Sequence, residues 1–428
     1  MPTASVPDTL RVLSTVLAPV LAQGPIIRRP RVLALAERLD ADRRAGRLLR
    51  RLRTRYGSGP LRLRVPGRSV VVLLSPEDVR TVLLGTPEPY TPANREKVAA
   101  LSHFQPHGVL VSSGPLRAER RRVNEAVLDT GQPVHRLGAD FAHAIRTETG
   151  TLPGELDWAG FSAMWWRIVR RIVLGAGARD DDELTDLLTG LRRATNGAYL
   201  PPKRAARRRR FEQRLRAHLD RAEPGSLAAL LARTPATDAA DPAGQVPHWL
   251  FAFDAAGIAA YRDLALVAAD PDASTDPAYL RAAVLESVRL WPTTMVILRD
   301  STAPVDGFPA GTAYVIVSSY LHRDPALPYA DRFAPEIWLD GRADDTGALV
   351  PFSAGPGTCP GRDLVLFTTG TLLDALLDGY RFRPVPRLDP AGPLPGTLDH
   401  TALRFAVTRS SGAPAEPVAQ SASQTVSM

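Results

Sequence analysis

The sequence contains a single cysteine among 428 residues, Cys359, in the stretch PFSAGPGTCPGRDLVLF (351–367). Glycine and proline crowd this stretch, and an apolar helical pattern follows it at once. A thiolate is favoured at a helix N-terminus, where backbone N–H groups and the helix dipole stabilise negative charge. Because Pro360 suits the first helical position, Cys359 is placed there as a reactive thiolate or a metal ligand. The alternative is a buried structural cysteine.

The residues around this cysteine resemble the haem-ligand signature of the cytochrome P-450 haem-thiolate enzymes, as Phe352-x-x-Gly355-x-x-x-Cys359-x-Gly361. The resemblance implies that Cys359 is the catalytic residue and the ligand of the iron in haem b. The thiolate of such enzymes pushes electron density toward the O–O bond of O2. Phe352, Gly355 and Gly361 are then cofactor-binding, and the glycines allow the flat porphyrin to approach closely.

A carboxylate and a guanidinium lie three residues apart in Glu286-Ser287-Val288-Arg289. This spacing puts both side chains on one helical face, close enough to pair. Alone, the pattern is that of a solvated helix salt bridge, but it matches the ExxR pair of the same family. The resemblance implies a third member, an Arg before the cysteine loop, and Arg332 in YADRF fits that place. We therefore expect a structural triad of Glu286, Arg289 and Arg332.

Three further arginines match family positions that contact the haem propionates. Arg299 follows the ExxR helix, whereas Arg117 and Arg121 lie in GPLRAERRR (114–122). Arg117 and Arg121 are four residues apart, so both side chains would point the same way on a helix. Their positive charges suit the two propionate carboxylates of haem. Gly357 replaces the His or Arg usual two residues before the cysteine, which removes one propionate contact, and Arg117 is expected to compensate.

The long apolar segment 246–270 departs from the family. Its central helix usually carries Ala/Gly-Gly-x-Asp/Glu-Thr, whose acid and alcohol help to deliver protons. With Gly257 as the anchor, these positions are Ala259 and Ala260. Asp263 lies one turn beyond, where it could feed a water chain or be an ordinary charge near a helix end. Tyr261 is expected to pack or to hydrogen-bond elsewhere.

Family positions also indicate which residues line the substrate pocket. Two alanines in place of the acid and the alcohol leave space for a bulky ligand. The expected lining residues are Leu250, Phe253, Ala256, Ala259, Ala260, Met295 and Val296.

The resemblance implies an oxidoreductase, a monooxygenase of natural-product biosynthesis acting on a sizeable polar or carboxylate-bearing intermediate. Without the acid–alcohol pair, the substrate's own polar group would organise water and protons. Alternatively, the chemistry needs less proton delivery, as in oxidative decarboxylation, ring formation, phenol coupling or peroxide use. A helper protein without activity of its own is a further hypothesis, which the presence of Cys359 disfavours. Electrons from NAD(P)H would arrive through a ferredoxin or flavodoxin docked on the basic cysteine side.

The elements that must position these residues are mostly helical. LRLRVPGRSVVVLL (61–74) predicts a hairpin, and Ser75-Pro76-Glu77 predicts a helix start. Apolar length predicts a buried central helix over 246–270, with further helices over 277–291 and 361–378. MVIL (295–298) and AYVIVSS (313–319) predict strands. The resemblance, from about residue 60 to 408, implies a triangular α-rich fold with small β-sheets and haem between the central helix and the cysteine loop.

We expect one domain over 1–408, with residues 1–30 peripheral, and a disordered tail over 409–428. The formal net charge of +8 comes almost entirely from arginine, which indicates a G+C-rich genome rather than nucleic-acid binding. KRAARRRRFEQRLR (203–216) carries eight basic residues and predicts a solvated helix face. A single cysteine excludes internal disulfides, and with no signal peptide or membrane span recognisable we expect a cytoplasmic monomer.

Overall fold

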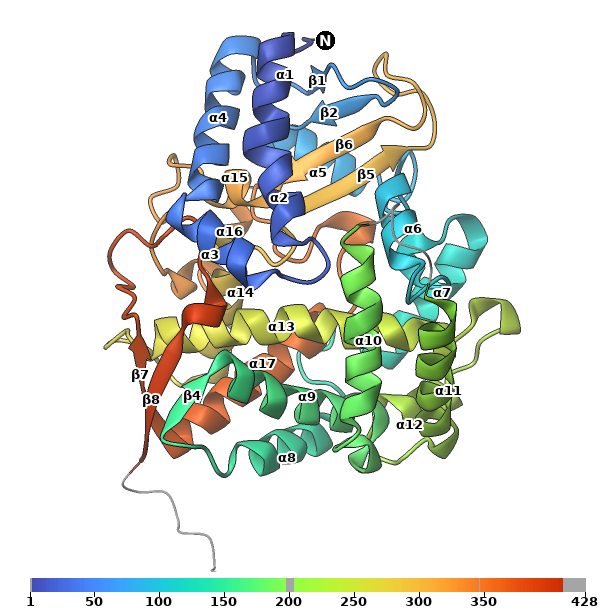
Figure 1. Ribbon diagram of the computed structural model, residues 1–428, viewed down its shortest axis with the longest axis vertical. Helices are drawn as coiled ribbons and strands as arrows, with labels where there is room; N and C mark the ends of the chain where they lie inside the picture. The colour runs from blue at the N-terminus through green and yellow to red at the C-terminus, as the bar shows by residue number, and fades with distance from the viewer. Residues whose placement is uncertain (1, 198–203, 346, 411–428) are drawn as a thin grey trace, which may run out of the picture.

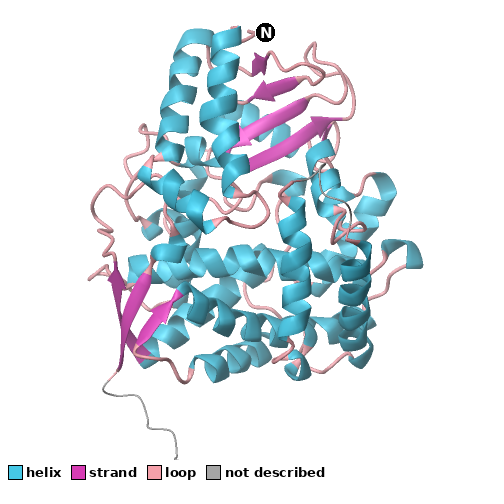
Figure 2. Ribbon diagram, in the orientation of Figure 1, coloured by secondary structure: helices cyan, strands magenta, loops and turns pink. Residues whose placement is uncertain are grey.

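Helices far outweigh strands in the computed structural model, which describes residues 2–197, 204–345 and 347–410 (Figures 1 and 2). The strands form two separate small sheets, one of five strands and one of three. The expected mostly helical architecture with small sheets is therefore confirmed.

The larger sheet has the strand order β1-β2-β6-β5-β3. The first two strands form the predicted hairpin, in which Leu61 faces Val72, whereas β2 and β6 run parallel. Bulky β-branched residues fill these strands, as a pleated and buried surface favours. The strands are β1 (Leu61–Leu63), β2 (Val70–Val72), β3 (Tyr90–Thr91), β5 (Val296–Ser301) and β6 (Ala313–Val317).

Helices of the N-terminal part of the chain and the short helix that follows β6 surround this sheet, and several of them share one apolar core with it. Ala4, Val12 and Val16 belong to that core, and the backbone N–H of Ala4 donates to the carbonyl of Arg62. The expectation that residues 1–30 are peripheral is therefore wrong for this part. The helices are α1 (Val6–Val12), α2 (Ala18–Gln23), α3 (Pro30–Arg38), α4 (Ala41–Tyr56), α5 (Pro76–Leu84) and α15 (Ser318–His322).

The remaining helices form the larger part of the molecule, and most of them lie in the lower half of Figure 1. The predicted central helix, α13, crosses this part and contacts α9, α14 and α17. The predicted helices over 277–291 and 361–378 are confirmed as α14 and α17. The helices are α6 (Arg95–Leu101), α7 (Gly114–Val127), α8 (Gly138–Thr149), α9 (Trp158–Leu174), α10 (Asp182–Thr195), α11 (Ala205–Arg221), α12 (Leu227–Arg233), α13 (Val246–Val267), α14 (Pro277–Leu290), α16 (Arg342–Asp345) and α17 (Arg362–Gly379).

The smaller sheet joins β4 (Glu155–Asp157), β8 (Arg404–Arg409) and β7 (Tyr380–Val385) in that order. Arg409 pairs with Tyr380 in this sheet, so the expected tail from residue 409 begins too early. Residues 411–428 lie outside the described part of the chain. Within the described ranges, no helix has the length and apolar character needed to cross a membrane.

The arginine-rich segment forms most of α11, and three of its arginines pair with acids. Arg208 pairs with Glu212, Arg210 with Glu183, and Arg214 with Asp181. Exposed pairs of this kind contribute little to stability. The predicted solvated helix face fits these contacts, while Lys203 lies outside the described residues.

Gly257 lets α9 and α13 approach closely. A Cβ atom at this position would lie 2.5 Å from Cδ1 of Trp165, whose indole N–H donates to the carbonyl of Phe253 at 2.7 Å. Both partners are buried in the main core. The glycine that anchors the family alignment is therefore required here by helix packing.

Gly257→Ala is expected to lower the free energy of unfolding by about 1–3 kcal/mol, because the indole or the helix must move to admit a methyl group. Urea unfolding followed by far-UV circular dichroism measures the change. Gly379→Ala is the control, since no atom lies within 4 Å of a Cβ placed there. Equal stability of the two variants would contradict this account of the α9–α13 contact.

Candidate functional site

The cysteine loop is a tight, hydrogen-bonded turn that leads into α17. The backbone N–H of Cys359 donates to the carbonyl of Phe352 at 2.9 Å. Thr358 closes the turn, with its N–H and its hydroxyl both donating to the carbonyl of Gly355, at 3.0 and 2.7 Å. Phe352, half-buried, packs against the main core. The loop thus holds the thiol in a defined place before the first residue of the helix.

Burial governs the protonation of the thiol. It raises the pKa of Cys359, while the backbone N–H of Gly361 and the charge of Arg121 oppose this rise. The predicted stabilisation of a thiolate by the helix start is therefore present, but burial outweighs it. Because a metal ion takes the thiolate form, metal binding would release the proton.

Protein contacts account for two of the loop glycines. Gly355 has a positive φ of 62°, and a Cβ there would lie 2.8 Å from the carbonyl oxygen of Leu83. A Cβ at Gly357 would lie 2.8 Å from Nη2 of Arg299. At Gly361 the nearest protein atom would be 3.7 Å away, so the protein itself leaves that position open. Contacts within the protein are thus sufficient to explain why Gly355 and Gly357 are glycines. At Gly361 it remains a prediction that the missing side chain leaves space for a porphyrin.

Two buried arginines beside the loop have no acidic partner. Arg117 is 6% exposed and Arg299 is 3% exposed. Among the described residues, no carboxylate oxygen lies within 4.0 Å of either guanidinium, and Nε of Arg117 has no hydrogen-bond partner. Arg299 donates to Thr86 Oγ1 and Ser353 Oγ, each at 3.2 Å. Burial, and then the charge of Arg117, lower the pKa of Arg299 to about 10, so the guanidinium of Arg299 remains cationic near neutral pH.

Arg121 has a different environment from the other two. Its Nη1 donates to the carbonyl of Thr358 at 2.7 Å, and its Nε pairs with Glu125. Because the guanidinium of Arg121 is already paired with a carboxylate, its attraction for a propionate is weaker. The structure therefore places Arg121 as a support for the cysteine loop, and its direct contact with the cofactor remains a prediction.

Lys97, which the sequence analysis missed, is a half-buried lysine close to these arginines. Its Nζ donates to the carbonyls of Pro92 and Leu298, the latter at 3.0 Å. Burial, followed by repulsion from Arg299, lowers the pKa of Lys97 to about 7. A signal was present, because the sequence contains only two lysines against 51 arginines. Lysine, unlike arginine, can change its charge when buried.

These observations decide whether the residues fit a haem. Desolvated cations without acids favour a ligand that carries carboxylates. Arg117 and Arg299 would hold the propionates, Lys97 lies beside Arg299, and Cys359 supplies one thiolate. Within the described residues there is no group of three or more His, Cys, Asp or Glu side chains that could hold a metal ion by itself. The residues therefore fit a metal carried by an anionic macrocycle.

Glu286 and Arg289 form a fully buried ion pair at the C-terminal end of α14. Arg289 donates to both carboxylate oxygens, at 2.7 and 2.6 Å. The same carboxylate accepts the backbone N–H of Ala334 and the indole N–H of Trp338, at 2.9 and 3.0 Å. Every oxygen is thus satisfied, the condition under which a buried ion pair is sustained.

Arg332 does not complete this pair with its side chain, so that part of the predicted triad is wrong. Its guanidinium is exposed, and only its backbone carbonyl takes part, accepting from Nη2 of Arg289 at 2.8 Å. Trp338, in the 3-10 turn Pro335–Trp338, provides the third side-chain donor instead. The order of motifs along the sequence located this segment correctly. The segment contacts the ion pair through backbone groups and through the indole of Trp338, and not through the side chain of Arg332.

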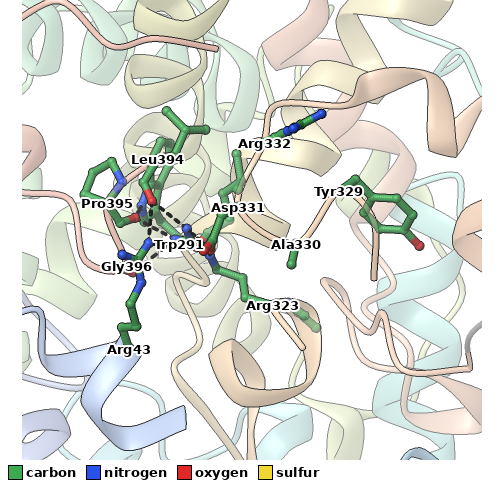
Figure 3. A network of polar contacts seen from close by, with 12 residues as sticks. Arg43, Trp291, Arg323, Tyr329, Ala330, Asp331, Arg332, Leu394, Pro395 and Gly396 are labelled. Carbon is green, nitrogen blue, oxygen red and sulfur yellow. Dashed lines mark hydrogen bonds and ion pairs between the residues drawn. The ribbon is translucent and has the colours of Figure 1, made fainter. Parts of the chain in front are cut away.

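Arg323 organises a neighbouring network that the sequence analysis also missed (Figure 3). Its Nε donates to Asp331 Oδ1 at 2.8 Å, and it also donates to the carbonyls of Leu394 and Pro395. Arg43 of α4 donates to the same aspartate and to Leu394. Three distant segments are therefore tied together, while Arg332 points away from them (Figure 3).

His322 connects the buried ion pair to the cysteine loop. Its carbonyl accepts from Nη1 of Arg289 at 2.9 Å, and its Nε2 accepts the backbone N–H of Val350 at 3.0 Å. Burial lowers the pKa of His322 to about 3, so the ring is neutral and can accept. The start of the loop is thus fixed relative to α14.

The segment of α13 that lacks the acid and the alcohol is buried and tightly packed. Ala259 and Ala260 are buried, and the hydroxyl of Ser287 on α14 donates to the carbonyl of Ala259 at 2.9 Å. The hydroxyl of Tyr261 donates to the carbonyl of Leu403 at 2.8 Å, as expected for a residue that bonds elsewhere.

Asp263 is fully buried, and neither carboxylate oxygen has a hydrogen-bond partner. Burial and the nearby charge of Glu286 raise its pKa well above 3.8. It is therefore not an ordinary charge near a helix end, but a buried acid that favours its neutral form.

The structure groups most of the expected pocket residues. Leu250, Phe253 and Ala256 are buried in the main core together with the two alanines. Met295 and Val296 are half-buried, and Val296 packs against the other core, that of the larger sheet. Their role in substrate binding remains a prediction.

Comparison with known proteins finds that part of the chain is similar to the cytochromes P450. The family model described as "Cytochrome P450" matches residues 272–403, which include α14 and the cysteine loop. Cyclooctat-9-en-7-ol 5-monooxygenase of Streptomyces melanosporofaciens is 37% identical over 115 residues, covering 25% of this chain and 25% of that protein. The match thus spans only about a quarter of the relative's length.

Solved structures match over far more of the chain. A crystallised cytochrome P450 aligns with a TM-score of 0.69 and 15% identity, covering 86% of this chain and 94% of that one. A six-coordinated cytochrome P450 from Thermus thermophilus aligns with a TM-score of 0.61 and 20% identity, covering 85% and 97%. The predicted fold is therefore confirmed.

Asp263→Asn is expected to stabilise the protein increasingly as pH rises above 3.8, the ordinary pKa of this carboxyl. The folded protein holds the proton more tightly than the unfolded chain, so the wild type loses stability through this window. The loss is about 1.4 kcal/mol per pH unit. The asparagine variant carries no such loss. Urea unfolding at several pH values measures the difference in the free energy of unfolding between the variant and the wild type, with the exposed Asp344→Asn as control. A difference that does not change with pH would contradict a buried, neutral Asp263.

Proposed function

We propose that the chain is a member of the cytochrome P450 family and a haem-thiolate monooxygenase of secondary metabolism, since residues 272–403 match that family and the fold is the same. The observation that carries the proposal is the placement of Cys359 in a closed loop beside two buried arginines that lack acids. A thiolate ligand and two carboxylate partners are what haem b requires from a protein. A helper protein without activity of its own would need neither the thiolate ligand nor the two buried arginines.

Haem, when bound, would supply the oxidative chemistry, with O2 as oxidant and electron density pushed from the thiolate. The chain's own residues would hold and orient it. Cys359 would ligate the iron, and Arg117 and Arg299 would bind the propionates. Arg121 would keep the loop carbonyl of Thr358 in place, and apolar α13 side chains would exclude water.

Proton delivery distinguishes this protein from relatives with an acid and an alcohol. The hydroxyl of Ser287 lies beside the position of the missing acid, but it already donates to the carbonyl of Ala259. Asp263 lies on the side of α13 where Glu286 raises its pKa. We therefore infer that a polar group on the substrate organises the water that carries protons. Oxidative decarboxylation, ring formation, phenol coupling or peroxide use is the second candidate, which the same two alanines favour.

The substrate that suits these features is a sizeable natural-product intermediate with a polar or carboxylate group. The Streptomyces relative is named for oxidation of cyclooctat-9-en-7-ol, a bulky hydroxylated hydrocarbon, which supports this class. Electrons would come from NAD(P)H through a ferredoxin or flavodoxin, whose acidic surface would dock near basic α7.

Cys359→Ala is expected to abolish the red-shifted Soret band of the reduced, carbon monoxide-bound protein, because that band requires thiolate ligation. Absorption spectroscopy of the haem-reconstituted variant and wild type measures it. Arg209→Gln, an exposed change on α11, is the control. Retention of the red-shifted band by a correctly folded Cys359→Ala protein would overturn the proposed function.

A further inference from the structure

A small polar cavity lies between α13, the loop that precedes β5, and the first helices of the described chain. Its volume is about 20 Å³, and its polar lining includes Gln23, Arg28, Asp42 and Arg262, with Met295 on one wall. A volume of this size holds one water-sized group. Because Met295 is an expected substrate-pocket residue, the cavity adjoins the place where the substrate is predicted to bind.

Two donors in this lining are buried without partners. Nε of Arg262 and Nε2 of Gln23 have no hydrogen-bond acceptor, and their residues are 4% and 2% exposed. Buried donors without acceptors are rare, and each costs free energy until an acceptor arrives. An oxygen atom placed in the cavity would provide that acceptor.

The two arginines of the cavity are bonded only to neutral groups. Arg28 donates to the carbonyls of Gly24 and Thr293, at 3.0 and 2.6 Å. Arg262 donates to the carbonyls of Trp291 and Leu398, at 3.1 and 3.0 Å. Within the described parts of the chain, no carboxylate oxygen comes within 4.0 Å of either guanidinium.

The pKa values of both arginines are lowered, by burial and, for Arg262, also by the charge of Arg28. Burial and then the charge of Arg28 lower the pKa of Arg262 to about 9, and burial lowers that of Arg28 to about 10. Asp42, Glu37 and Asp399 oppose this from farther away. Burial raises the pKa of Asp42, whose Oδ2 accepts the hydroxyl of Thr397 at 2.7 Å.

The surroundings of the cavity are electropositive. Burial, followed by Arg262 and Arg28, lowers the pKa of His400 well below 6.5, so this ring is neutral and leaves the positive charge on the arginines. Asp42 and Ser319 also line a pocket of about 150 Å³. Arg43, Arg47, Arg50 and Arg323 line that pocket together with Asp331, which pairs with Arg43 and Arg323. The positive charge that continues outward is therefore that of Arg47 and Arg50.

We propose that Arg28 and Arg262, with Gln23, form a binding site for a carboxylate, namely one carried by the substrate. The proposal rests on the proposed function and names its substrate class. One carboxylate oxygen accepts from Nε of Arg262 and Nε2 of Gln23 inside the cavity. The rest of the ligand passes Met295, whose flexible side chain can move aside. The anchored carboxylate would also set the substrate's position for oxidation.

The test compares two probes of the same length, octanoate and octanamide, with acetate as the shortest carboxylate. The haem-loaded protein is titrated with each, and binding is followed by the rise in unfolding temperature and by the haem spin-state change. Wild type is expected to bind octanoate at least about tenfold more tightly than octanamide, as charge-assisted hydrogen bonds predict. Arg262→Gln and Arg28→Gln should reduce this ratio to near one, whereas exposed Arg209→Gln should leave it unchanged.

The outcomes separate the possible sources of the carboxylate. Octanoate binding with a spin-state change identifies a substrate anchor, whereas stabilisation by acetate that octanoate does not exceed identifies a site for free carboxylates. Equal binding of octanoate and octanamide by wild type, or a preference retained by Arg28→Gln, overturns the proposal. If Arg262→Gln does not fold, the ratio of octanoate to octanamide affinity in the wild type and in the Arg28→Gln variant still tests the proposal.

The same samples separate this proposal from the proposed function. A missing red-shifted Soret band refutes the haem-thiolate assignment, while the unfolding temperatures still report carboxylate binding. A normal band with no carboxylate preference refutes the site alone.

Discussion

Uncompensated positive charge beside the cysteine loop is the constraint on which the rest of this site depends. Arg117 and Arg299 are desolvated, and the acids that usually accompany buried arginines are missing from their described surroundings. Such charges are costly unless an anion completes them. Gly357 lies close to this charge, since a Cβ atom there would be 2.8 Å from Nη2 of Arg299 and the guanidinium would have to shift. The loop and its cations therefore form one unit, for which an anionic ligand is the missing partner.

A second kind of buried charge holds that unit in place. Glu286 and Arg289 satisfy each other and also bind backbone groups, so their role is structural. Through His322 they reach Val350, the last residue before the stretch that contains Cys359. Breaking one partner of such a pair typically costs about 3–5 kcal/mol. The position of the thiol thus depends on an ion pair that never touches it.

Much of this arrangement could be predicted from the sequence. Apolar periodicity located α13, α14 and α17, and residue spacing located the cysteine loop and the Glu286–Arg289 pair. Spacing identifies which face of a helix a residue occupies, but not which group faces it from another segment. For that reason Arg332 was chosen where Trp338 provides the donor, and the networks of Arg323 and Lys97 were missed. Asp263 was ambiguous for the same reason, because its burial depends on α14. The N-terminal pattern also did not reveal that Ala4, Val12 and Val16 belong to the core of the larger sheet.

The central claim is that the buried cations and the cysteine loop together bind a haem through its carboxylates. The most direct measurement compares haem with its dimethyl ester, in which both propionates are neutral, by titration into the haem-free protein. The account predicts that haem binds at least about tenfold more tightly than the ester, as two lost charge-assisted hydrogen bonds imply. Substituting Arg117 and Arg299 by glutamine should then remove the difference. Equal affinity of the wild type for haem and for its ester would contradict the account.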